Sequence, residues 1–133
     1  MTEVVVDTDV VSFLFKNHPL GYRYDADLIG RVPLNSFMTV AELERWALQY
    51  DWSPRRLHGL HLYLKRFVVV PSSSDLCHQW AEVMVAAQGA GRRIESADAW
   101  IAASALLDKA PLLTHNRNDY LGVPGLKLIP HGE

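Results

Sequence analysis

The stretch Val4-Val5-Val6-Asp7-Thr8-Asp9 decides how the rest of the chain is read. Three consecutive β-branched residues predict a short strand buried on both faces, as in a parallel sheet. The strand ends at a carboxylate, and apolar residues at helical spacing follow over positions 10–15. Because open α/β sheets bind ligands at the carboxyl ends of their strands, we expect Asp7 to mark a candidate site.

Composition limits the classes of protein that the chain can belong to. A length of 133 residues with 49% apolar and 21% charged residues is typical of one soluble globular domain, spanning residues 1–133. The formal charge of −2 gives no overall basic footprint, so any contact with nucleic acid has to come from a local patch. The chain starts without the basic and apolar segments of a secretory signal and contains no apolar run long enough to span a bilayer. We therefore expect a cytoplasmic protein that does not contact membranes.

Strands and helices alternate along the chain. The pattern predicts strands at 4–6, 35–38, 67–71, 112–114 and 126–129, and helices at 10–15, 25–31, 39–50, from Ser53-Pro54 onward, 76–90 and from Ser96 onward. This alternation is typical of an α/β fold in which a parallel sheet is covered on both faces. Thr39-Val40-Ala41-Glu42 matches a capping box, which predicts a helix start at Thr39. Cys77 lies in an apolar helical pattern and is expected to be a buried thiol.

Acidic residues follow several of these elements. Asp7 ends the first strand, Glu42 and Asp98 lie in the first turns of two predicted helices, and Asp119 follows the strand at 112–114. Since right-handed crossovers return parallel strands in one direction, their carboxyl ends share one edge. At least Asp7, Glu42 and Asp119 are therefore expected at one crevice.

Each acid also has a purely structural explanation. Glu42 could complete the capping box, Asp98 could complement the dipole of a helix capped by Ser96, and Asp119 could stabilise a turn. Asp7 could receive backbone donors at the strand-to-helix turn, with Asp9 as the helix cap. These readings stay open for each residue taken singly.

Taken together, the acids favour a metal site. Carboxylates gathered at one edge without interleaved lysines repel one another and raise each other's pKa unless a cation neutralises them. Mg²⁺ or Mn²⁺ suits an oxygen-rich site of this kind. Such a site can activate water for in-line displacement at phosphorus, so the sequence predicts metal-dependent phosphodiester hydrolysis.

Four pieces of the chain resemble the PIN-domain family, in particular the small VapC-type toxins of bacterial toxin–antitoxin pairs. They lie at 5–9 (Val-Val-Asp-Thr-Asp), 39–43 (Thr-Val-Ala-Glu-Leu), 98–103 (Asp-Ala-Trp-Ile-Ala-Ala) and 114–120 (Thr-His-Asn-Arg-Asn-Asp-Tyr). Their order and spacing cover almost the whole chain. Position 120 is Tyr where Phe is common, and position 116 is Asn where some members carry an acid.

The resemblance implies a three-layer α/β/α sandwich with a mostly parallel sheet of about five strands. It also implies an Mg²⁺- or Mn²⁺-dependent endoribonuclease that acts as a homodimer and is inhibited by a VapB-type antitoxin. DNA would be contacted only indirectly, through that antitoxin. By motif, the resemblance assigns the catalytic and metal-binding acids, which are Asp7, Glu42, Asp98 and Asp119. It assigns the supporting polar residues as Thr8, Thr114 and Asn116.

Three arginines are candidate contacts to a nucleic-acid substrate. Arg92 and Arg93, in a glycine-flanked loop before the Asp98 helix, and Arg117, at the crevice rim, are candidate RNA phosphate contacts, with solvated surface charge as the alternative. Two other functions remain open: a PIN-type RNA-processing nuclease without an antitoxin, and a catalytically silent module that binds RNA or protein. The presence of all four acids argues against the silent module.

Overall fold

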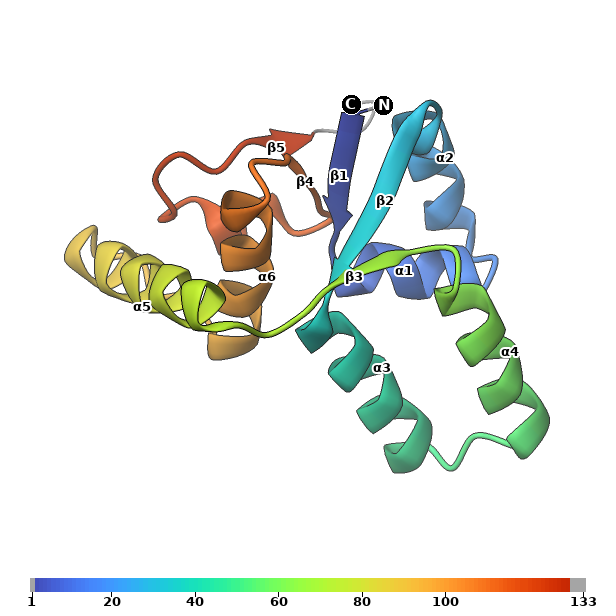
Figure 1. The fold of residues 1–133 in the computed structure, drawn as a ribbon. Coiled ribbons are helices and arrows are strands. Elements are labelled where there is room, and N and C mark those ends of the chain that lie inside the picture. The colour runs from blue at the N-terminus through green and yellow to red at the C-terminus, as the bar shows by residue number, and fades with distance from the viewer. Residues whose placement is uncertain (1, 130–133) are drawn as a thin grey trace.

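A five-stranded, wholly parallel sheet lies at the centre of the computed structural model, which describes residues 2–129 (Figure 1). The strands occur in the order β3-β2-β1-β4-β5. Their bounds are β1 Thr2–Val6, β2 Arg31–Ser36, β3 Val68–Val70, β4 Leu112–Leu113 and β5 Leu128–Ile129. The α/β class with a parallel sheet, predicted from the sequence, is confirmed.

The helices form two groups, one on each face of this sheet. In Figure 1, α1 to α4 lie on one side of the strands and α5 and α6 on the other. Their bounds are α1 Thr8–Phe15, α2 Tyr22–Leu28, α3 Phe37–Gln49, α4 Pro54–Leu64, α5 Ser74–Gly89 and α6 Ser96–Leu107, with short 3₁₀ helices η1 Pro19–Gly21 and η2 Arg117–Tyr120. The described chain has no helix with the length and apolarity needed to cross a bilayer.

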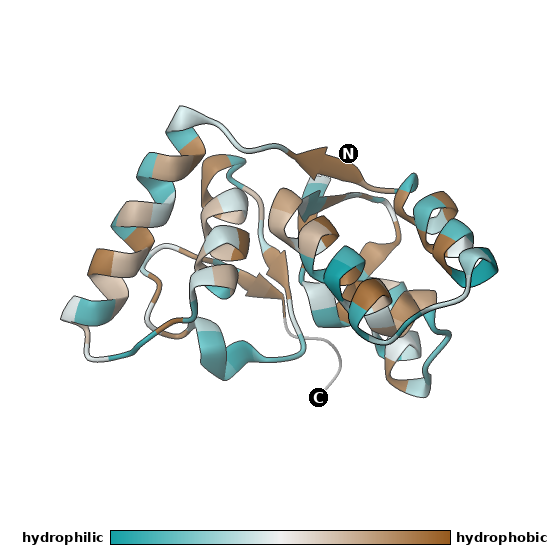
Figure 2. Cartoon of the chain, turned by 90° about the horizontal axis from the view of Figure 1, so that it is seen from below, coloured by the Kyte–Doolittle hydropathy of each residue, from teal (hydrophilic) through white to brown (hydrophobic). Residues whose placement is uncertain are grey.

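Strand β1 supplies the core on both faces. Val4 and Val6 belong to the apolar cluster under α1, α3 and α4, whereas Val5 belongs to the cluster under α5 and α6. Successive side chains of a strand point to opposite faces, so the three fully buried valines of β1 fit a central strand that is covered on both faces. Figure 2 shows the hydrophobic strands between the two helical groups, whose outer turns carry much of the hydrophilic colour.

The order of the strands creates a switch point beside β1. Val5 pairs with Leu34 of β2 on one side and with Leu112 of β4 on the other. The chain leaves β1 to build β2 and β3, and then crosses the sheet to build β4 and β5. Open α/β sheets bind ligands at the carboxyl ends of strands where this reversal occurs. Asp7 and Thr114 directly follow β1 and β4, so both lie at the switch point.

Several local predictions are wrong: β2 and α2 begin earlier than the predicted strand at 35–38 and helix at 25–31, and the start of α3 and the burial of Cys77 also differ. Helix α3 begins at Phe37, not at Thr39, because the Ser36 side chain accepts the Met38 N–H at 3.1 Å and acts as the N-cap. Thr39 is fully buried within the helix, so the capping box with Glu42 does not form. Cys77 is exposed, because it lies next to Leu76 and therefore about 100° round the helix from the buried face of α5.

The four tryptophans pack within the fold. Trp80 of α5 stacks on Trp100 of α6 with 4.9 Å between ring centroids, and Phe37 meets Trp100 edge to face. Trp46 and Trp52 lie partly buried against the opposite apolar cluster. Trp100 of α6 therefore contacts both Trp80 of α5 and Phe37, the first residue of α3. These contacts lie close to the first turn of α6, which carries Asp98.

Gly122 lies at a close approach between two segments that flank the candidate site. A Cβ atom at this position would lie 2.7 Å from the Arg92 Cβ and 3.0 Å from the Arg92 carbonyl oxygen. We expect Gly122→Ala to push the Arg92 loop away from the segment after η2 and to lower the free energy of unfolding by about 1–3 kcal/mol. Urea unfolding followed by circular dichroism measures this change.

Gly59→Ala is the matched control for that substitution. A Cβ atom at Gly59, inside α4, meets nothing within 4 Å, so this change should stabilise the helix by about 0.5–1 kcal/mol. Equal stability of the Gly122→Ala and wild-type proteins would contradict the close approach.

Candidate metal site at the switch point of the sheet

Asp7 is the most enclosed acid of the site. Its Oδ1 accepts the Thr8 N–H at 2.7 Å, and its Oδ2 accepts the Thr114 hydroxyl at 2.7 Å and the Tyr120 hydroxyl at 3.0 Å. Only 5% of Asp7 is exposed. Burial raises the pKa of Asp7 to about 6, although the three donors oppose the rise and hold the carboxylate in place.

Asp98 reaches the same point from the opposite side. A helix that leads into a parallel strand runs against it, so the first turn of α6 lies at the carboxyl edge of the sheet. The Tyr120 hydroxyl lies 3.3 Å from Asp98 Oδ1. Burial, and after it the charges of Asp7, Asp119 and Glu42, raise the pKa of Asp98 to about 7. The other three predicted acids therefore all act electrostatically on the Asp98 carboxyl group.

Glu42 is held by two threonines. The Thr8 hydroxyl donates to Glu42 Oε1 at 2.8 Å and lies 2.9 Å from the Thr39 hydroxyl. Because Thr8 has one hydroxyl proton and directs it to the carboxylate, Thr39 is the donor to Thr8. Burial raises the pKa of Glu42. Thr39 thus positions Thr8, and Thr8 positions Glu42, across the gap between α1 and α3.

The Thr-x-Asn-x-x-Asp segment after β4 contributes the remaining predicted residues. The buried Thr114 hydroxyl accepts the Asn116 N–H at 3.0 Å while donating to Asp7. Asp119 is exposed on η2, and its N–H donates to the Asn116 carbonyl oxygen at 3.0 Å. This segment therefore joins an enclosed acid to one that faces solvent.

Asp9 is a fifth acid at the site that the sequence analysis treated only as a possible helix cap. The structure gives the N-cap position to Asp7, and Asp9 instead accepts a hydrogen bond from the Asn116 side chain. Its charge raises the pKa of Glu42 and of Asp7. The Asp-x-Asp spacing carried the signal, because two residues in the first turn of one helix both face the end of the sheet.

The donor set suits a hard divalent cation in charge and chemistry. Among residues 2–129, the ion pairs within 4.0 Å join His61 to Glu44 and His78 to Glu82, so none of the four predicted acids has a cationic partner at that distance. One hydroxyl oxygen contacts both Asp7 and Asp98, so these two carboxylates are close enough to share a ligand. As the described side chains lie, no three acids, histidines or cysteines converge on one point. Glu42 and Asp119 would therefore have to turn, or to act through water.

The three predicted arginines lie in different surroundings. Arg92 and Arg93 are exposed in the loop between α5 and α6, as a surface that contacts phosphate requires. Arg117 is partly buried on η2, and its Nη1 is enclosed without a hydrogen-bond partner. Because this nitrogen is enclosed, Arg117 would have to turn outward to donate to an incoming oxyanion.

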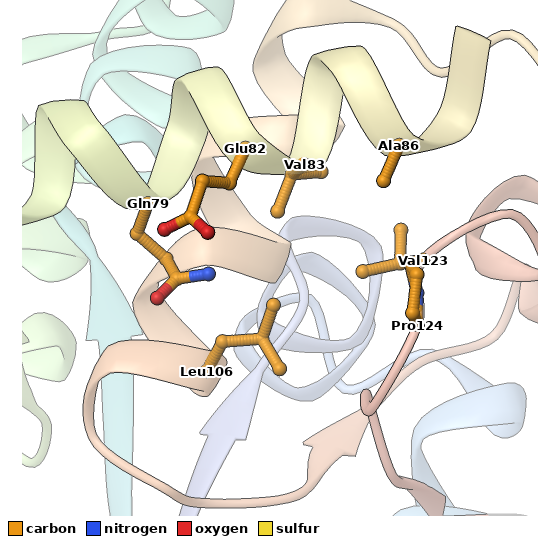
Figure 3. A pocket seen from close by; sticks show the side chains of 7 residues that line it. All are labelled: Gln79, Glu82, Val83, Ala86, Leu106, Val123 and Pro124. Carbon is orange, nitrogen blue, oxygen red and sulfur yellow. The ribbon is translucent and has the colours of Figure 1, made fainter. Parts of the chain in front are cut away.

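A separate pocket of about 180 Å³ lies between α5, α6 and the segment after η2 (Figure 3). Its lining combines Gln79 and Glu82 with apolar side chains, namely Val83, Ala86, Leu106, Val123 and Pro124. None of the site acids lines it. This pocket is therefore distinct from the acidic site.

Comparisons with known proteins match this architecture. The sequence model described as PIN domain matches residues 4–121. Ribonuclease VapC1 of Haemophilus influenzae strain R2866 is 27% identical over 125 residues, which cover 92% of this chain and 93% of that protein. A crystal structure of VapBC2 from Rickettsia felis, bound to a DNA fragment from its promoter, superposes with a TM-score of 0.85 at 21% identity, covering 96% and 98% of the two chains. The VapBC-1 structure from nontypeable Haemophilus influenzae has a TM-score of 0.78 at 26% identity, covering 96% and 97%.

Proposed function

The chain belongs to the PIN-domain family, and from this premise we propose that it is an Mg²⁺- or Mn²⁺-dependent endoribonuclease, the toxin of a type II toxin–antitoxin pair. The observation that carries the proposal is the meeting of Asp7 and Asp98 at the switch point, where one hydroxyl contacts both carboxylates and no cation of the described chain pairs with them. A ribonuclease of similar sequence and nearly equal length supports the choice of substrate.

Asp7 and Asp98 would hold the divalent cation directly, and Glu42 and Asp119 directly or through water. The cation supplies activation of water and neutralisation of charge on the phosphate. The chain itself orients these ligands: Thr8, Thr39 and Thr114 hold Glu42 and Asp7 at distances of 2.7–2.9 Å. Asn116 ties Asp9 to the segment that carries Asp119.

Arg92, Arg93 and Arg117 are the proposed contacts to RNA phosphates. With water as the nucleophile, hydrolysis leaves 5′-phosphate and 3′-hydroxyl ends, and the 2′-hydroxyl takes no part in the displacement. Preference for RNA must therefore come from shape and from contacts to the ribose.

We propose that the protein acts as a homodimer and is inhibited by a VapB-type antitoxin, with DNA contacted only through that partner. The support is the likeness to VapBC complexes, one of them bound to a promoter DNA fragment. A reading frame for a small DNA-binding protein next to this gene, whose product co-purifies with the protein and suppresses its activity, is the expected result. Its absence would favour an RNA-processing nuclease.

The test of the activity is cleavage of a labelled pool of structured RNAs by the purified protein with Mn²⁺, with Mg²⁺ and with EDTA. We expect cleavage with either metal, none with EDTA, and products with 5′-phosphate ends. Cleavage that survives EDTA, or that leaves 2′,3′-cyclic phosphates, contradicts the proposal. A protein that binds Mn²⁺ and RNA without cleaving any of the pool would instead favour the silent binding module.

A further inference from the structure

The Tyr120 hydroxyl lies between the carboxylates of Asp7 and Asp98, which share no other hydrogen-bond partner among residues 2–129. It is 3.0 Å from Asp7 Oδ2 and 3.3 Å from Asp98 Oδ1. Only 2% of Tyr120 is exposed, and the ring packs in the apolar cluster under α5 and α6. The ring is therefore fixed by the core, and the hydroxyl is the one part of the side chain that faces the acids.

This hydroxyl completes the hydrogen bonding of Asp7 Oδ2. A carboxylate oxygen has about two lone-pair sites, and Oδ2 already accepts the Thr114 hydroxyl at 2.7 Å. With Tyr120 as the second donor, no lone pair of Oδ2 remains for a cation. Oδ1 accepts only the Thr8 N–H, so it keeps one site. The shorter of the two Tyr120 contacts, at 3.0 Å, thus occupies the last free lone pair of Asp7 Oδ2.

We propose that Tyr120 is a positioning residue whose hydroxyl holds the Asp7 and Asp98 carboxylates together in the metal-free protein and competes with a divalent cation for their oxygens. This role rests on the metal site of the proposed function. A cation that binds Asp7 through Oδ2 or Asp98 through Oδ1 needs a lone pair that the hydroxyl now engages, so its binding there has to turn the hydroxyl away from that carboxylate. Tyr120 thereby weakens metal binding while stabilising the empty site.

The test is Tyr120→Phe, which keeps the ring in the core and removes only the hydroxyl. We expect isothermal titration with MnCl₂ at pH 8 to show about three- to tenfold tighter binding than in the wild type, as expected for one lost competing hydrogen bond. The metal-free variant should also melt below the metal-free wild type, because Asp7 loses its second hydroxyl donor and Asp98 loses its contact with the same hydroxyl. Tyr63→Phe, which removes a hydroxyl remote from the acids, is the matched control and should change neither quantity.

A second measurement does not depend on the folding of a variant. In wild-type protein labelled with ¹³C at the tyrosine Cζ positions, addition of MgCl₂ should shift the Tyr120 resonance and leave that of Tyr63 in place. Mn²⁺ affinities equal within twofold, weaker binding by Tyr120→Phe, or an unmoved Tyr120 resonance in Mg²⁺-saturated protein would each overturn the competition. A wild-type protein that binds no Mn²⁺ contradicts the proposed metal site itself, so the two failures are distinguishable.

Discussion

Asp98→Asn protein is expected to lose RNA cleavage by roughly a thousandfold or more while it keeps its fold. Asn has the size of Asp and can still accept the Tyr120 hydroxyl through its amide oxygen. It has no negative charge, so it cannot serve as an anionic ligand opposite Asp7. Asp98 is also the acid whose pKa is raised by each of the other three predicted acids, which identifies it as their common neighbour.

Asp75→Asn is the control for this loss. Asp75 is exposed in the first turn of α5, as Asp98 lies in the first turn of α6, but it is away from the switch point. Under the proposed function, the Asp75→Asn protein should cleave RNA at the wild-type rate. Initial rates with saturating Mn²⁺ compare the three proteins, and circular dichroism confirms their folding. An Asp98→Asn protein with more than a tenth of the wild-type rate would remove Asp98 from the active site.

The metal-free protein is expected to become less stable as the pH rises from 4 to 7. Burial raises the pKa of Asp7 to about 6 and that of Asp98 to about 7, whereas in the unfolded chain both lie near 3.8. Between these values the folded protein binds more protons than the unfolded chain, so the free energy of unfolding falls as the pH rises and levels off above pH 7. The shift of Asp7 alone corresponds to a loss of about 3 kcal/mol, and Asp98, which is partly exposed and therefore screened by solvent, adds a smaller loss than its shift alone would give.

Urea unfolding in EDTA at intervals between pH 4 and 8 measures this dependence. The Asp98→Asn protein should show a shallower fall and should be more stable than the wild type at pH 8, because one of the repelling charges is gone. Addition of Mn²⁺ at pH 8 should raise the free energy of unfolding of the wild-type protein and have little effect on that of the variant. Identical curves for the two proteins in EDTA would contradict the repulsion among the acids.

The fold follows from sequence patterns that act over long stretches. A run of three valines can be buried on both faces only inside a sheet, and the alternation of strands and helices then requires parallel pairing. Boundaries were less predictable, because they depend on single hydrogen bonds. Ser36 and Thr39 are both good N-cap residues. Ser36 takes the N-cap position, and the Thr39 hydroxyl contacts Thr8 instead, some thirty residues away in the chain.

The site could be predicted as a set of acids, but its internal connections could not. Strand order alone brings Asp7 to the switch point, and the direction of α6 brings Asp98 there. Asp9 was missed because its partner, Asn116, is recognisable only after β4 has been placed beside β1. The bridging position of Tyr120 depends in the same way on the packing of η2, so motif matching treated it as a mild replacement for Phe.

The partners of Asp7 are separated from it by nearly the whole chain: Thr114 and Tyr120 lie 107 and 113 residues further on. A ribosome synthesises the chain from its N-terminus, so Asp7 emerges early and remains without these donors until β4 has docked on β1. The four acids cannot all come together before that step. Under the proposed function, a nascent chain therefore cannot cleave RNA through most of its own synthesis, because its site is incomplete until β4 and the segment after it have docked.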